Sequence, residues 1–138
     1  MLESKFRQRD ECVEELKEWM GRGKNLVILD GGDPTVFSQL FFWLIEGLPE
    51  DQVEIVPGIG AMTAAFAALK RCSTGANARY VAQTDLRRFV GDEEPDDLAR
   101  DLSRYPGTLV FYMALEGLYR LVAVLGRFNP VDMPVAVV

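Results

Sequence analysis

The chain has 138 residues, of which 49% are hydrophobic and 26% charged, so its composition is that of one folded domain and not of a disordered segment. Its net charge of −6, without a run of Lys or Arg, argues against a nucleic-acid partner, which would normally leave a basic face. It contains no histidine, which excludes Ser-His-Asp and Cys-His enzymes and most zinc hydrolases.

The first half of the chain alternates between helical and strand patterns. Apolar residues at helical spacing predict a helix over 7–21. The short apolar run at 25–29 ("NLVIL") is typical of a strand buried on both faces, and "VEIV" at 53–56 predicts a second strand. Helical spacing returns over 36–48, and an alanine-rich stretch predicts a helix over about 61–70.

The second half continues the alternation. It predicts a weaker strand at 79–83 and a strong one at 107–113, followed by a helix over 116–125. The acidic loop at 91–97 is expected to lead into a short helix near its proline. The final run at 135–138 ("VAVV") follows a proline-rich linker and reads as another strand.

This order of elements predicts an α/β fold, with three αβα layers around a mostly parallel sheet. We expect an α/β ligand-binding domain over 1–130, with 131–138 forming a linker and the first strand of a second domain. No apolar run reaches the roughly 18 residues of a membrane helix. The charged start has no signal-peptide stretch, so a cytoplasmic location is expected.

Three turn sequences follow predicted strands: GGDP at 31–34, VPGIGA at 56–61 and YMALEG at 112–117. Taken singly, each has an ordinary structural explanation, since Asp33 and Pro34 suit the start of a helix and Pro-Gly is a common turn. Because ligands bind at the carboxyl ends of parallel strands, the three together favour a pocket.

The predicted pocket differs from the usual phosphate sites. The chain contains neither G-x-x-x-x-G-K-[ST] nor G-x-G-x-x-G. The carboxylate of Asp33 would also compete with a phosphate at the expected helix start. A ligand without phosphate, or with positive charge, therefore fits better. With two distant cysteines, Cys12 and Cys72, a metal site is not expected, and Cys12 is predicted to be a buried thiol.

The segments "GGDPTVF", "EIVPGIGAMTAAFAAL" and "TLVFYMALEGL" resemble, in this order and spacing, the tetrapyrrole (corrin/porphyrin) methylases, which include uroporphyrinogen-III C-methyltransferase and the precorrin methyltransferases. The resemblance implies S-adenosylmethionine as methyl donor and a tetrapyrrole of cobalamin or sirohaem biosynthesis as acceptor. It also implies a set of cofactor-binding residues: Gly31, Gly32, Asp33, Val36, Gly60, Ala61 and Met113. No catalytic base is identified, and Asp33 is only a weak candidate.

Compared with the family pattern, the sequence lacks an opening strand with its G-x-G-P-G-D loop and a second domain. Gly60 stands where uroporphyrinogen methylases have threonine, and "LKRCSTG" replaces their "PLTHR". The sequence is therefore interpreted as the N-terminal portion of a methyltransferase, inactive alone. Since the family's first strand is interior, its loss would expose a sheet edge, and a homodimer or a rearranged sheet is expected.

Two alternatives stay open at this point. The domain could be a non-catalytic interaction module that keeps the fold without the site, which the missing glycine loop and Gly60 favour. It could also be a relative that methylates a protein or ribosomal RNA, although the acidic balance weighs against RNA.

Overall fold

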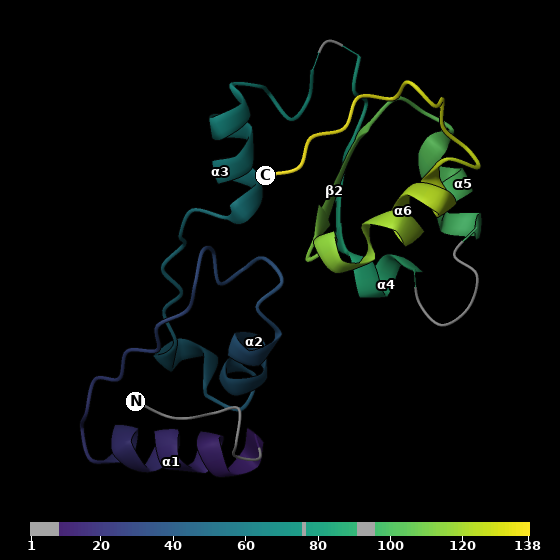
Figure 1. The fold of residues 1–138 in the computed structure, drawn as a ribbon. Helices are drawn as coiled ribbons and strands as arrows, with labels where there is room; N and C mark the ends of the chain where they lie inside the picture. Colours follow the sequence, from purple (N-terminus) through teal and green to yellow (C-terminus); the bar gives the residue numbers. More distant parts are fainter. Residues whose placement is uncertain (1–8, 76, 91–95) are drawn as a thin grey trace. The chain divides into compact units, whose positions relative to one another are not determined.

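The computed structural model describes residues 9–75, 77–90 and 96–138 (Figure 1). They fall into two compact units, unit 1 (Met1–Ala64) and unit 2 (Ala65–Val138), each of which has its own apolar core. None of the helices in these described ranges is long and apolar enough to cross a membrane.

Unit 1 is built on a pair of helices, α1 (Arg9–Gly21) and α2 (Gln39–Ile45). A short 3-10 helix, η2 (Glu50–Gln52), follows, and α3 (Ala61–Leu69) begins at the end of the unit. Cys12, Val13 and Leu16 of α1 pack on Leu44 of α2 and are nearly inaccessible to solvent. Burying each such aliphatic side chain contributes about 1.5–3 kcal/mol. The prediction that Cys12 is a buried thiol is confirmed.

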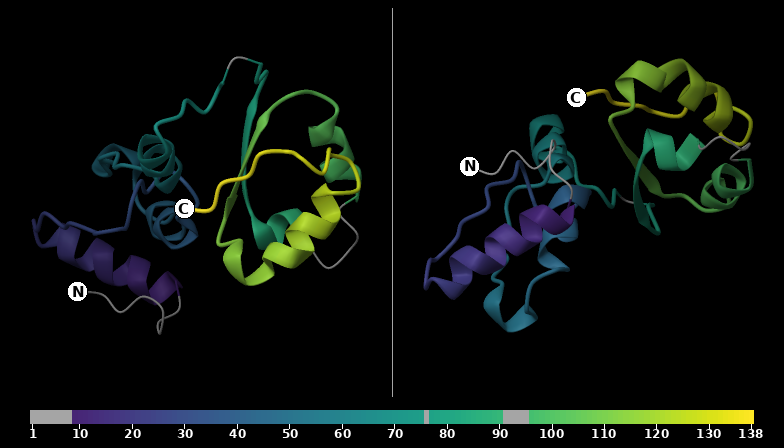
Figure 2. Two further views of the ribbon diagram at one scale, coloured as in Figure 1. Left: turned by 45° about the horizontal axis from the view of Figure 1, so that its top comes forward. Right: turned by 90° about the horizontal axis from the view of Figure 1, so that it is seen from below.

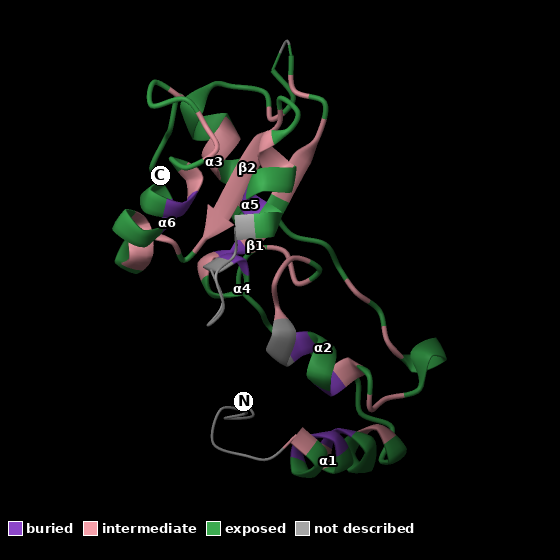
Figure 3. Ribbon diagram, turned by 90° about the vertical axis from the view of Figure 1, so that its right-hand side faces the viewer, coloured by how far each residue is buried: buried purple, intermediate pink, exposed green. Residues whose placement is uncertain are grey.

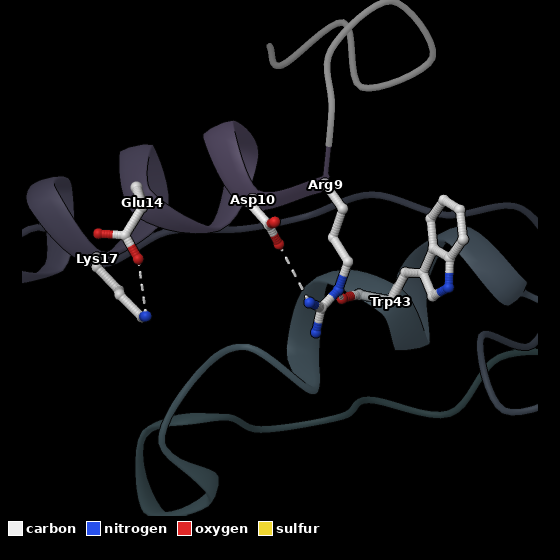
Figure 4. A network of polar contacts seen from close by, with 5 residues as sticks. All are labelled: Arg9, Asp10, Glu14, Lys17 and Trp43. Atoms are coloured by element: carbon white, nitrogen blue, oxygen red, sulfur yellow. Dashed lines mark hydrogen bonds and ion pairs between the residues drawn. The ribbon is translucent and has the colours of Figure 1, made fainter.

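One polar contact ties the two helices of unit 1 together (Figure 4). Arg9 Nε donates a 2.6 Å hydrogen bond to the carbonyl oxygen of Trp43 in the last turn of α2. The last four carbonyls of a helix have no partner within it, so this bond satisfies one of them. The neighbouring Lys17–Glu14 pair, at 2.9 Å, is exposed and contributes little to stability.

Unit 2 contains a two-stranded parallel sheet of β1 (Val81–Asp85) and β2 (Thr108–Tyr112), with Val81 opposite Thr108. The connection between the strands holds α4 (Leu86–Val90) and α5 (Asp96–Ser103). After β2 come the 3-10 helix η3 (Leu115–Gly117) and α6 (Leu118–Leu125). The α/β class and the parallel pairing are confirmed, in a sheet smaller than predicted.

The core of unit 2 lies between its helices and one side of the sheet (Figures 1 and 2). Phe89 of α4, Ala99 of α5, and Leu121 and Val124 of α6 are buried together. The Phe89 ring meets Phe111 of β2 edge-on, with centroids 4.8 Å apart. Figure 3 shows the buried residues gathered on the facing sides of these helices and of α1 and α2.

The strands predicted at 25–29 and 53–56 are wrong as ladder-forming strands, whereas the strand at 135–138, assigned to a second domain, stays a prediction. Among the described residues these segments run without strand pairing. Val27 and Leu29 are 82% and 87% exposed. An apolar run makes a strand only if a neighbouring strand accepts and donates its backbone hydrogen bonds. The sequence pattern shows that each apolar run can form a strand, but it does not show whether a neighbouring strand is available to pair with it.

The predicted helix over 36–48 is also corrected. It begins at Gln39, so Asp33 and Pro34 do not start it, and residues 34–37 form turns. Phe37 has a left-handed backbone, with φ of +58°, which no helix continues through.

Other expectations are close to the structure. α3 spans Ala61–Leu69 as predicted, and the helix over 116–125 appears as η3 and α6. β1 begins two residues later than predicted, although Arg79 N–H already donates to the Pro106 carbonyl at 2.8 Å. α4 was not predicted. The acidic loop lies mostly outside the described residues, and the short helix expected after it is α5.

Candidate functional site

The GGDP sequence lies in a loop, here named the first loop (residues 30–38), whose ends are joined by side chains. Asp30 Oδ1 accepts a 2.7 Å hydrogen bond from the Gly31 N–H. Its other carboxylate oxygen, Oδ2, accepts a hydrogen bond from the Ser38 hydroxyl. Asp30 is the first residue of the loop and Ser38 the last, so this one carboxylate closes the loop.

Asp33 organises the middle of the first loop. Its Oδ1 accepts hydrogen bonds from the Thr35 hydroxyl at 2.6 Å and the Thr35 N–H at 2.9 Å. The Val36 N–H donates to the Asp33 carbonyl at 3.1 Å. The hydroxyl bond, with the backbone bond second, lowers the pKa of Asp33 below its usual 3.8. The Asp33 side chain is therefore an anion at neutral pH.

Two residues of the first loop have left-handed backbone conformations. Gly32 has φ of +74°, which glycine adopts without strain. Phe37 has φ of +58°, which is unfavourable for a bulky side chain. Strained backbone of this kind concentrates at functional loops. The conformation of the first loop is thus imposed by its bonds and contacts.

The turn at residues 57–60, here named the second loop, lies directly against the first loop within unit 1. A Cβ added to Gly58 would stand 1.9 Å from the Gly32 carbonyl oxygen, so only glycine permits this approach. A Cβ on Gly60 would lie 3.6 Å from Asp33 Cβ, and one on Gly32 would lie 3.6 Å from the Ile59 carbonyl oxygen. The structure therefore brings together the GGDP and PGIG sequences, as expected.

The two loops leave their glycine backbone open to a ligand. Gly31, Gly32 and Ala61 are exposed, whereas Asp33, Val36 and Gly60 are partly exposed. No heavy atom lies within 4 Å of a Cβ built on Gly31. The sequences of both loops contain two carboxylates, Asp30 and Asp33, and no basic side chain. Such a surface attracts a cation and repels a phosphate.

Met113, the candidate from the third turn, belongs to unit 2. It directly follows β2, is 73% exposed and has φ of +50°, another strained conformation outside glycine. Its position at the carboxyl end of a parallel strand matches the expectation. Its contribution to a site with the loops of unit 1 stays a prediction.

The carboxyl edge of the sheet in unit 2 also holds a buried carboxylate, Asp85, the last residue of β1. Asp85 Oδ1 accepts the Arg88 N–H at 2.9 Å, and Oδ2 lies 3.1 Å from Arg88 Nε. Both contacts come from Arg88 in the first turn of α4, and because its backbone N–H is one of them, the carboxylate caps this helix. A buried charge needs such partners, and the pair serves the local fold.

Sequence reasoning missed Asp30, Ser38 and Gly58. The sequence offered a signal for each of them: polar residues on both sides of the GGDP turn, and a Pro-Gly pair at 57–58. Only the structure shows that Asp30 reaches Ser38 and that Gly58 touches Gly32. Within residues 9–75, 77–90 and 96–138, no group of three or more His, Cys, Asp or Glu side chains is arranged to hold a metal.

Comparison with known proteins yields one family. The model of the tetrapyrrole (corrin/porphyrin) methylases matches residues 2–138. Neither the curated proteins nor the solved structures gave a match. The family match covers both loops of unit 1 and the Met113 turn of unit 2. The chain therefore belongs to the tetrapyrrole (corrin/porphyrin) methylase family.

Proposed function

We propose that the chain is the cofactor-binding portion of a methyltransferase that transfers a methyl group from S-adenosylmethionine to a tetrapyrrole. The observation that carries the proposal is the contact between two glycine loops, at Gly58 and Gly32, in a chain of this family. The family supports a methyltransferase role in general. A corrin or porphyrin precursor as acceptor is the finer part of the proposal.

The chemistry of the loops fits this cofactor. S-adenosylmethionine has no phosphate and carries a sulfonium and an ammonium group. The first loop offers the carboxylates of Asp30 and Asp33, and neither loop contributes Lys or Arg. The open backbone at Gly31 lets a ligand approach its peptide groups closely.

Six residues of unit 1 would hold the cofactor, in the roles that follow from their positions: Gly31, Gly32, Asp33, Val36, Gly60 and Ala61. The peptide groups of the first loop would bind and orient it, and Val36 would provide an apolar contact. Gly60 and Ala61 would line it from the second loop, and a role for Met113, in the turn after β2 of unit 2, stays a prediction from the sequence. When bound, the cofactor supplies an already activated methyl group. The protein then has to orient the methyl donor and the acceptor toward each other and to exclude water from them.

No residue of the described chain is assigned as a catalytic base. Asp33 has both Thr35 bonds on one carboxylate oxygen, and its lowered pKa makes it a weak proton acceptor. We propose that its role is to shape the loop and to present negative charge. A homodimeric state and a cytoplasmic location stay predictions from the sequence.

A non-catalytic role for the domain is the second candidate. It is favoured by the unpaired segments at 25–29 and 53–56, since the loops that follow them are not anchored by a sheet. In that case the loops would keep their contact but bind no cofactor.

Calorimetric titration separates the two candidates. S-adenosylmethionine is titrated into the chain, and ATP is the control, because it shares the adenosine but carries phosphates. We expect binding of S-adenosylmethionine and none of ATP. Absence of S-adenosylmethionine binding up to roughly 1 mM, which corresponds to about −4 kcal/mol, would favour the non-catalytic role. Stronger binding of ATP would contradict the charge argument.

A further inference from the structure

Asp30 is the residue of the first loop whose side chain joins the two ends of the loop. Both its carboxylate oxygens accept hydrogen bonds, one from the Gly31 N–H at the start of the loop and one from the Ser38 hydroxyl at its end. Between these ends lie Gly32 and Phe37 with left-handed backbones. The loop is exposed at Asp30, so burial does not hold it in place.

We propose that Asp30 is a positioning and specificity residue of the cofactor site: through Ser38 it holds the first loop in its binding conformation, and by its charge it favours S-adenosylmethionine over the demethylated product. The proposal rests on the proposed function. It assigns no contact between Asp30 and the ligand, because the carboxylate is already occupied by Gly31 and Ser38.

The positioning part follows from the entropy of the loop. A loop that is free before binding must be ordered when the ligand binds, and this weakens the affinity. The Asp30–Ser38 bond orders the loop beforehand, with Gly31 and Gly32 exposed between its ends. Removing this bond should therefore weaken every ligand of the loop by a similar factor.

The charge part follows from the difference between donor and product. S-adenosylmethionine has one positive charge more than S-adenosylhomocysteine, which has lost the methyl group and with it the sulfonium charge. Asp30 and Asp33 place two negative charges in one loop that has no basic side chain. Their attraction to the ammonium group is common to both ligands, whereas their attraction to the sulfonium exists only for the donor, so the product is held less tightly. Salt screens such an exposed interaction, and low ionic strength strengthens it.

Three variants of the chain separate the two parts. Ser38→Ala removes the bond and keeps both carboxylates. Asp30→Asn removes the charge, while its amide oxygen can still accept from Gly31 and its amide N–H can donate to the Ser38 hydroxyl oxygen. Asp51→Asn, in η2 of the same unit, removes one negative charge outside both loops and is the matched control.

The affinities for S-adenosylmethionine and S-adenosylhomocysteine are measured by calorimetry at low and moderate salt. Ser38→Ala should weaken both ligands by the same factor, roughly threefold to tenfold. Asp30→Asn should weaken S-adenosylmethionine roughly threefold to tenfold more than the product, and less so at higher salt. Asp51→Asn should change neither.

A second measurement needs no ligand. Hydrogen–deuterium exchange of residues 31–38 should be faster in Ser38→Ala than in the unaltered chain, while exchange in α1 stays the same. Unchanged exchange and unchanged affinities in Ser38→Ala would overturn the positioning role. Equal losses for both ligands in Asp30→Asn would overturn the charge role. Failure of the unaltered chain to bind either ligand would instead overturn the proposed function, and the exchange result would still test the loop.

Discussion

Units 1 and 2 contain apolar runs of the same kind, yet among the residues that the structure describes only those of unit 2 form a sheet. Residues 81–85 and 108–112 pair in parallel, and the residues of β2 are all partly shielded from solvent. Residues 25–29 have an equally apolar sequence but remain exposed along their whole length. The difference indicates that strand formation depends on a neighbouring strand and on helices that cover the sheet. In unit 2 the helices α4, α5 and α6 provide this cover.

The largest effect is expected where the sheet and its helices share a core. Phe89→Ala should destabilise unit 2 by about 3–5 kcal/mol, because it removes a buried ring that packs on Phe111. Urea unfolding followed by tyrosine fluorescence reports on unit 2, which contains all four tyrosines.

The matched variant is Leu16→Ala, which creates a cavity in the core of unit 1. It should lower the urea concentration of the unfolding transition followed by tryptophan fluorescence, since Trp19 and Trp43 both lie in that unit. If Phe89→Ala shifted the tryptophan and tyrosine transitions equally, the two cores would not be separate.

The next largest effect concerns the contact between the first and second loops of unit 1, which no paired strands support. In Gly58→Ala the new methyl group would meet the Gly32 carbonyl oxygen at 1.9 Å, so the two loops must separate. We expect a loss of about 1–3 kcal/mol in stability and of binding to S-adenosylmethionine. Calorimetry and thermal unfolding test this.

Gly21→Ala is the control for that substitution, because no heavy atom lies within 4 Å of its added Cβ. Binding that survives in Gly58→Ala would show that the contact between the loops does not matter to the ligand.

A small effect is expected from the unpaired run itself. Leu29 is 87% exposed, so Leu29→Lys should change stability by no more than about 0.5 kcal/mol. Leu44→Lys, at a site that is 5% exposed in the same unit, should unfold the helix pair. Circular dichroism during urea unfolding compares the two. A loss above about 1 kcal/mol in Leu29→Lys would indicate that the segment is covered in solution.

The smallest effect is electrostatic and confined to the first loop. Thr35→Val removes the hydroxyl that donates to Asp33, so the pKa of Asp33 should rise toward 3.8. Because the pKa is lowered in the folded chain, the Thr35 bonds favour the native loop at pH above 3.8 and are lost as the pH falls through the lowered pKa. Carboxyl NMR titration measures the shift, and an unchanged value in Thr35→Val would contradict this assignment.

Local patterns predicted most helices, although not the bounds of α2 or the existence of α4, and they predicted the sheet poorly. The alanine-rich sequence of α3 favours a helix by its composition alone, and the predicted bounds of this helix agree with the structure to within one residue. The five-residue helix α4 carries too short a pattern to be recognised. Residues 25–29 and 53–56 have the composition of strands, but their partners are a property of the whole fold, which local composition does not contain.

The candidate site was predicted in part. The meeting of GGDP and PGIG was expected from a shared sheet edge, and the loops do meet. They meet, however, through the close approach of Gly58 to the Gly32 carbonyl, without strand pairing before them. The Asp30–Ser38 bond spans the whole loop and depends on its shape, so no spacing rule reveals it.

The crossover between β1 and β2 has a consequence for biosynthesis. α1 and α2, which form the core of unit 1, are both synthesised before residue 50 and before any part of unit 2, so this helix pair can form early. β1 has no partner strand until Thr108–Tyr112 has been synthesised. The core of unit 2 also needs Leu121 and Val124 of α6. The nascent chain therefore exposes a lone strand edge for more than a third of the length of unit 2. This interval is when a chaperone would have most to protect.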